Sequence, residues 1–101
     1  MEKWKNVYKL IAYPSGGILS KVLSKSGSGS ITLFCMAKGT EISEHTSTRQ
    51  GLVLVLEGRG TFNLKGEDIA MAPGVAIFME RNAVHWLKAW ENTAYLLMLY
   101  G

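Results

Sequence analysis

The chain contains two histidines, His45 and His85, and imidazole is the side chain best suited to proton transfer near neutral pH or to binding a transition metal. Each lies in a segment punctuated by glycine, with five residues between Gly39 and His45 and ten between Gly74 and His85. Forty positions of short β-type segments and turns separate the two histidines. A barrel would bring both rings into one pocket, so the pair indicates a binding site more clearly than it names a reaction.

The predicted ligand pocket comprises His45, Ser47, Gly51 and His85. Ser47 would add a hydroxyl donor, and the two neutral imidazoles would hydrogen-bond a polar ligand or shuttle protons. Cys35 lies within the apolar run 31–37, where a buried thiol behaves as a small hydrophobe, so we expect it in the core rather than in the site.

Short β-type segments with turn residues between them must position these side chains. The expected strands are 18–23, 31–37, 41–46, 51–57, 61–65, 68–71, 75–79, 85–90 and 93–100. Strands at this spacing predict an all-β sandwich or barrel. Residues 24–30 (SKSGSGS) are expected to be a hairpin loop, Pro73-Gly74 fits the centre of a type II turn, and 2–11 is compatible with a short N-terminal helix.

Length predicts one domain over residues 1–101, with 1–17 as an N-terminal segment and 18–101 as the barrel. At 48% hydrophobic residues, the chain has more apolar surface than so small a core buries easily, which favours a homodimer. Successive side chains of a strand point to opposite faces. If Gly51 faces inward, three leucines of the same strand face outward, and if His85 faces inward, two tryptophans near it face outward. The expected interface residues are Leu52, Leu54, Leu56, Trp86 and Trp90.

Charge and apolar patterning argue against two classes of partner. The net charge is +3, but the eleven basic residues are scattered without a run, which does not suit nucleic-acid binding. The longest apolar stretches are far too short to span a bilayer, and the first ten residues do not resemble a signal peptide. We therefore expect a cytoplasmic protein with no membrane or nucleic-acid partner and, with a single cysteine, no internal disulfide.

From about residue 18 onward the chain resembles a small single-domain cupin of the conserved-barrel type. The first cupin motif is matched in spacing by Gly39, His45 and Gly58, and the second by Gly74 and His85. Glu80 stands in the proline slot of the second motif and Asn82 in its glycine slot. Segments 43–58 and 82–89 are similar to small, mostly uncharacterised cupins. The resemblance implies a double-stranded β-helix, or jelly roll.

The same resemblance implies a metal centre of three histidines and one glutamate, which this sequence fills only in part. Ser47 occupies the second histidine slot and Gly51 the glutamate slot, so His45 and His85 remain as an incomplete metal site. Two imidazoles without a carboxylate hold Zn, Ni, Fe or Mn weakly, and we expect no tightly bound metal. Among the nearest carboxylates, Glu41, Glu44 and Glu80, only Glu41 shares strand parity with His45, at about 13 Å along the strand.

Three functions follow, and the sequence leaves open whether the protein is an enzyme. The first is binding of a small organic molecule in the barrel pocket near His45 and His85. The second is a metal-dependent oxygenase, isomerase or lyase of the kind that the resemblance implies, with both histidines as ligands. The third is a structural or sensory dimeric module.

Overall fold

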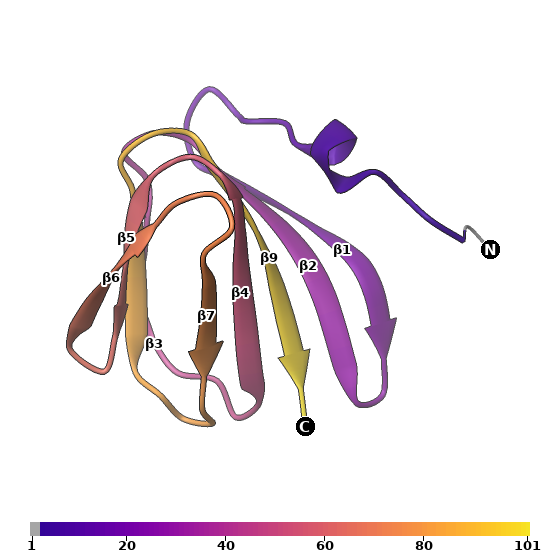
Figure 1. Ribbon diagram of the computed structural model, residues 1–101, viewed down its shortest axis with the longest axis vertical. Helices are drawn as coiled ribbons and strands as arrows, with labels where there is room; N and C mark the ends of the chain where they lie inside the picture. The colour runs from indigo at the N-terminus through magenta and orange to yellow at the C-terminus, as the bar shows by residue number, and fades with distance from the viewer. Residues whose placement is uncertain (1–2) are drawn as a thin grey trace.

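The computed structural model describes residues 3–101, which form two antiparallel β-sheets (Figure 1). The strands are β1 (Ile18–Ser26), β2 (Gly29–Met36), β3 (Glu41–His45), β4 (Gln50–Glu57), β5 (Gly60–Leu64), β6 (Glu67–Met71), β7 (Ala76–Met79), β8 (His85–Ala89) and β9 (Thr93–Tyr100). The five-stranded sheet has the order β1-β2-β9-β4-β7, and the four-stranded sheet has the order β3-β8-β5-β6. The all-β jelly roll is therefore confirmed.

The inner faces of the two sheets enclose the main core. Along β4, Gly51, Val53 and Val55 are buried, and along β8 the buried residues are His85, Leu87 and Ala89. Period-two alternation in both strands therefore predicts the inward faces correctly. The buried members of this cluster are Met36, Val53, Val55, Phe62, Met71, Ile77, Met79, Leu87, Ala89 and Tyr95.

The turns agree with the sequence prediction at one position and differ at another. Gly74 has φ +89°, and the Val75 N–H donates to the Ala72 carbonyl at 3.0 Å, as a type II turn centred on Pro73-Gly74 requires. The hairpin expected over 24–30 is present, but its loop is shorter than expected, because β1 and β2 pair as far as Ser26 opposite Gly29. Serines join this ladder because backbone pairing makes no demand on side-chain polarity, and two residues make the turn.

The N-terminal segment covers part of the outer face of the five-stranded sheet. Within the expected helical region, the described residues form a single 3-10 turn, η1 (Val7–Leu10), in which Asn6 Oδ1 accepts from the Tyr8 N–H at 3.1 Å. Residue 2 lies outside the described part of the chain. The segment packs on a second apolar cluster that consists of Leu33, Cys35, Leu56 and Ala94. Cys35 is thus a core residue, as its apolar neighbours predict.

The residues expected at a subunit interface lie on two different faces. Leu52 and Leu54 are half-buried on the outer face of the five-stranded sheet, whereas Trp86 and Trp90 are on the outer face of the four-stranded sheet. Leu56 is only 7% exposed, because it packs with the cluster beneath the N-terminal segment. The expectation of an outward-facing Leu56 available to a partner is therefore wrong. Within residues 3–101, no helix has the length and apolar character required to cross a bilayer.

Candidate functional site

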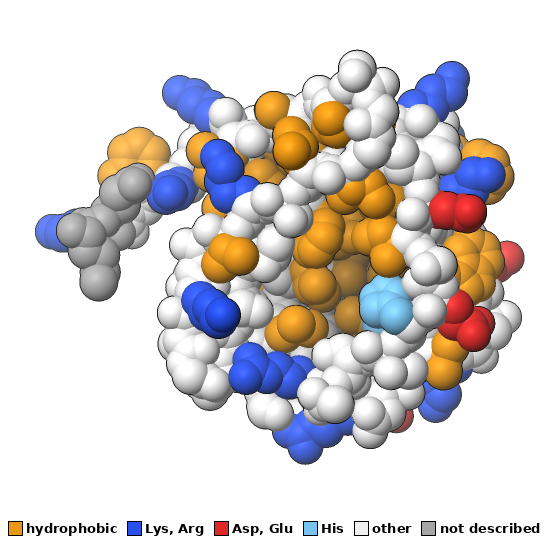
Figure 2. Space-filling view, turned by 180° about the vertical axis from the view of Figure 1, so that it is seen from behind, with side chains coloured by type: hydrophobic (Ala, Val, Ile, Leu, Met, Phe, Trp, Pro, Cys, Tyr) orange, Lys and Arg blue, Asp and Glu red, His pale blue; other side chains and the backbone are white. Residues whose placement is uncertain are grey.

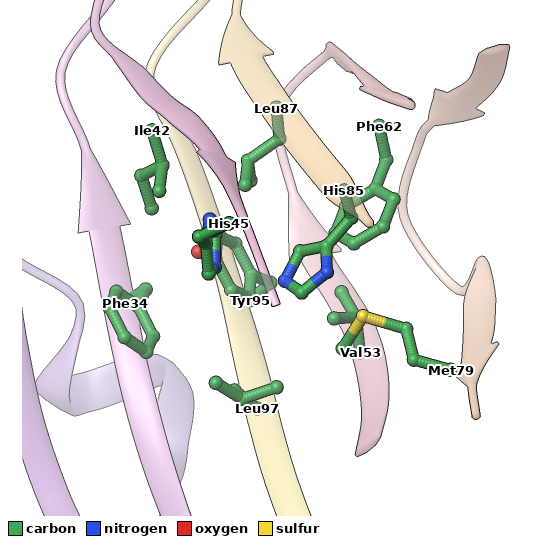
Figure 3. Close-up of a pocket in the computed structure, with 10 residues that line it drawn as sticks. All are labelled: Phe34, Ile42, His45, Val53, Phe62, Met79, His85, Leu87, Tyr95 and Leu97. Atoms are coloured by element: carbon green, nitrogen blue, oxygen red, sulfur yellow. The ribbon is translucent and has the colours of Figure 1, made fainter. Parts of the chain in front are cut away.

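The two imidazoles are in direct contact. His45 at the end of β3 pairs with His85 at the start of β8, and their ring centroids are 4.0 Å apart with an interplanar angle of 62°. Both rings lie among the residues that line a pocket between the sheets (Figure 3). Antiparallel pairing of two neighbouring strands thus brings together two histidines that are forty positions apart in the sequence.

A β-bulge in β3 turns His45 toward this pocket. Glu41 pairs with Lys88 and Ile42 with Leu87, but the register shifts by one residue before His45 meets His85. The extra residue re-aims the side chains that follow it. The expected shared parity of Glu41 and His45 is therefore wrong, since Glu41 pairs with a residue of the outward row while His45 lines the pocket.

The loop that follows His45 and the loop that precedes His85 are tied together by backbone hydrogen bonding. The Asn82 N–H donates to the Ser47 carbonyl at 2.7 Å. Asn82 adopts φ +63°, a left-handed conformation that asparagine tolerates better than most residues, and it stands where the cupin motif has glycine. The Ser47 hydroxyl accepts from the Arg49 N–H at 3.1 Å, and Ser47 is not among the residues that line the pocket. Its observed contacts are those of a loop residue.

The pocket has a volume of about 120 Å³ and opens to the surface. Figure 2 shows the hollow lined by hydrophobic side chains, with a histidine on its wall. The lining residues are Phe34, Ile42, His45, Val53, Phe62, Met79, His85, Leu87, Tyr95 and Leu97. Gly51 lies behind this wall, where a Cβ would approach the Met79 methyl group to 2.7 Å, so it makes room for Met79.

Aromatic residues that the sequence analysis did not assign to the site complete its walls. Phe62 stacks on His85 at 5.6 Å, and Phe34 stacks on Tyr95 at 5.1 Å. Burial raises the pKa of Tyr95 above its usual range, so this side chain is a neutral phenol. Tyr95 is in a continuously apolar strand, where no alternation marks the inward face, and the sequence therefore carries little signal for it.

The hydrogen bonds of the two imidazoles fix where each carries its proton. His45 Nδ1 lies 2.7 Å from the Ser43 carbonyl, and His85 Nδ1 lies 2.9 Å from the Ala83 carbonyl. Because a carbonyl oxygen only accepts, each Nδ1 donates, and Nε2 of each neutral ring is an acceptor. Burial lowers the pKa of His85; the hydrogen bond to the Ala83 carbonyl opposes this in part, and the neighbouring His45 adds a smaller downward effect. His85 is consequently neutral at pH 7.

The donor set does not fit the four-ligand metal centre that the resemblance implies. Among the described residues, no three His, Cys, Asp or Glu side chains come together as metal ligands. Glu44 and Glu80 are exposed and are not in the pocket lining, and Cys35 belongs to the cluster on the opposite face of the sheet. The pocket offers two imidazoles and a neutral phenol, whereas catalytic centres usually use three protein ligands.

Comparison with known proteins places the chain among β-barrel proteins. The family model of the cupin domain matches residues 32–100. A conserved protein of unknown function from Streptococcus pyogenes is 27% identical with a TM-score of 0.89, over 99% of this chain and 88% of that one. A cupin superfamily protein from Desulfitobacterium hafniense is 22% identical with a TM-score of 0.90, over 99% and 92%.

A cupin 2 conserved barrel domain protein from Leptotrichia buccalis is 26% identical with a TM-score of 0.89, over 96% of this chain and 47% of that one. Comparison with curated proteins found no match. These similarities concern the fold, and none of the three names states a ligand or a reaction.

Proposed function

This chain belongs to the cupin family, and on that premise we propose that its barrel pocket binds a small organic molecule beside His45 and His85. The observation that carries the proposal is the contact between two imidazoles on the wall of an open apolar cavity. Ligand sites in proteins are typically concave and apolar, with a few convergent polar groups that orient the ligand. The described pocket has this composition, since its polar groups are two imidazoles and one phenol.

A ligand screen with a cavity-filling variant tests the proposal. Small neutral and charged ring compounds would be added to the protein, and a compound bound in the pocket should raise the midpoint of thermal unfolding by mass action. Leu97→Phe adds bulk at the pocket wall and should abolish the shift. Leu96→Phe is the matched control, because Leu96 packs against the cluster on the opposite face. A shift that survives Leu97→Phe, or no shift with any compound, contradicts the proposal.

A metal-dependent oxygenase, isomerase or lyase is the second candidate. The observation that favours it is that two adjacent rings each commit Nδ1 to a carbonyl, which leaves Nε2 of the neutral ring as a nitrogen that can bind a metal. Elemental analysis of protein purified without a histidine tag should then find stoichiometric metal, and the double change His45→Ala, His85→Ala should remove it. Trace metal in protein supplied with Fe, Mn, Ni or Zn would end this candidacy.

We also propose that the chain forms a homodimer through the outer face of the five-stranded sheet. Its accessible surface of 6231 Å² exceeds the roughly 5,700 Å² expected of a monomer of this mass. Phe78 is 69% exposed and pairs with half-buried Leu52, which pairs on its other side with half-buried Met98. A two-fold interface uses one patch on both copies, so the tryptophans of the other sheet would lie outside it.

Light scattering after size-exclusion chromatography tests the dimer. The unchanged protein should elute as a dimer at micromolar concentration, and Leu52→Lys should elute as a folded monomer. Trp90→Lys is the control on the opposite sheet and should remain dimeric. A monomeric wild-type peak would contradict the proposal.

A further inference from the structure

We infer that the pocket selects a neutral molecule with an O–H or N–H donor on an apolar body of about one ring, and that the donor binds between the Nε2 atoms of His45 and His85. This inference rests on the proposed function and specifies the ligand class for the same pocket. Its basis is the hydrogen bonding of the two rings, the nature of the surrounding walls and the size of the cavity.

In its neutral form, each imidazole presents an acceptor rather than a donor to the pocket. Each Nδ1–H is committed to a carbonyl two residues earlier, at 2.7 Å for His45 and 2.9 Å for His85. Among the described residues, every fully buried side-chain nitrogen or oxygen has a hydrogen-bond partner. The hydrogen bond of the His85 ring is made by Nδ1, so Nε2 is not fully buried and borders the open space of the pocket. The two rings are neighbours on one wall of the pocket, with centroids 4.0 Å apart.

The rest of the wall supplies at most one donor for these two acceptors. Tyr95 contributes a phenolic O–H, and the other lining side chains are hydrocarbon, phenyl or thioether groups. At least one Nε2 therefore depends on water or a ligand for its hydrogen bond. A carboxylate has no donor at neutral pH and would meet lone pairs, whereas a hydroxyl group satisfies the acceptor that the protein leaves open.

The cavity volume limits the part of the ligand that enters. The pocket measures about 120 Å³, slightly less than the roughly 150 Å³ of an engineered cavity that holds benzene. The deep wall is buried hydrocarbon, since Val53, Phe62 and Leu87 are each no more than 2% exposed, while His45 is exposed at the mouth. A one-ring body would thus lie against the deep wall with its hydroxyl group at the histidines.

Binding of four one-ring probes at pH 7.5 tests the inference: phenol, anisole, toluene and benzoate. Affinities would be measured by protein-detected NMR titration, which also locates the contact. We expect phenol to bind roughly two- to ten-fold more tightly than toluene or anisole, the factor that one net hydrogen bond provides. Benzoate should bind most weakly. His45→Leu removes one acceptor at an exposed position and should reduce the preference for phenol while toluene binding persists.

Tyr13→Phe is the control, because the Tyr13 hydroxyl donates to Glu57 and its ring packs on the face of the sheet opposite the pocket. It should leave all four affinities unchanged. Equal binding of phenol, anisole and toluene would overturn the donor requirement while the proposed function stands. Preferred binding of benzoate would also overturn it, as it requires protonated Nε2 atoms. Stoichiometric Zn²⁺ binding that excludes phenol would overturn the inference, because a metal ion and not a ligand donor would then occupy the Nε2 atoms. Binding of none of the four probes would contradict both the inference and the proposed function.

Discussion

The two faces of the five-stranded sheet carry apolar surfaces that are covered in different ways. The inner face packs against the second sheet and retains a cavity of about 120 Å³ beside the histidines. The outer face is covered by the N-terminal segment, with a cavity of about 110 Å³ bordered by Leu33 and Cys35. The volumes are nearly equal, so volume does not distinguish a binding site from a packing gap. The difference lies in polar groups, because two imidazole acceptors converge only on the inner cavity among the described residues.

The largest expected effect concerns the inner face. Phe62 is 1% exposed, stacks on His85 and forms part of the pocket wall. Phe62→Ala should lower the free energy of unfolding by about 4 kcal/mol through lost burial and an enlarged cavity. Urea denaturation measures the loss. A cost below about 1 kcal/mol would contradict the role of this ring as the link between the pocket and the core.

A substitution at Leu33 tests whether the N-terminal segment covers the outer face of the sheet as tightly as the second sheet covers the inner face. It lies on the sheet surface yet is only 1% exposed, since the segment packs over its cluster. Leu33→Ala should cost about 3 kcal/mol by the same denaturation measurement. Val22→Ala, at a 60% exposed position, is the control and should cost less than about 1 kcal/mol. Similar small losses for both variants would mean that the outer cluster is open to water.

The buried imidazole should make the inner face sensitive to acid. Burial lowers the pKa of His85 from its ordinary value of 6.5, so the unfolded chain takes up this proton more readily than the folded chain. Stability should therefore decline as pH falls below about 6.5 and level off below the folded pKa. Thermal unfolding midpoints at pH 8 to 5 measure this, with His85→Phe as the comparison. An equal acid dependence in that variant would assign the effect to other groups.

The smallest expected effect concerns a polar contact at the outer face. The Tyr13 hydroxyl donates to Glu57 Oε2 at 2.6 Å, and burial followed by the effects of Glu57 raises the pKa of Tyr13 above its usual range. Tyr13→Phe should cost about 1 kcal/mol in urea denaturation, because a partly buried carboxylate loses its donor. Phenol binding should be unaffected, since Tyr13 lies on the face opposite the pocket. A changed affinity would show that the two faces are coupled.

The fold was largely predictable because alternation and turn chemistry are local properties of the sequence. Parity places Val53 on the same face as Gly51 and Leu87 on the same face as His85, and the turn preference of Pro73-Gly74 predicts a turn. The orientation of His45 relative to Glu41 was not predictable, since the bulge between Ile42 and His45 contains no glycine to mark it. A one-residue shift reverses which side chains share a face.

The burial of the outer face beneath the N-terminal segment was not predictable, because it depends on long-range packing that local sequence patterns do not encode. Leu56 alternates like an exposed residue, but the N-terminal segment, more than forty positions earlier, covers it. Tyr95 was missed for a related reason, because strand β9 is apolar on both faces and each face meets a different partner. The two histidines were expected in one pocket because a barrel would bring them together, and their rings are in contact; the sequence could not place the Ser47 side chain.

Heteronuclear NMR of the imidazole nitrogens tests the central claim, that His45 and His85 share one cavity as paired Nε2 acceptors. At pH 7.5 both rings should show a protonated Nδ1 and an unprotonated Nε2, with cross-peaks between the ring protons of the two residues. Added phenol should shift both Nε2 resonances. A proton on Nε2 of either ring, or the absence of contact between the rings in the folded protein, would contradict the account.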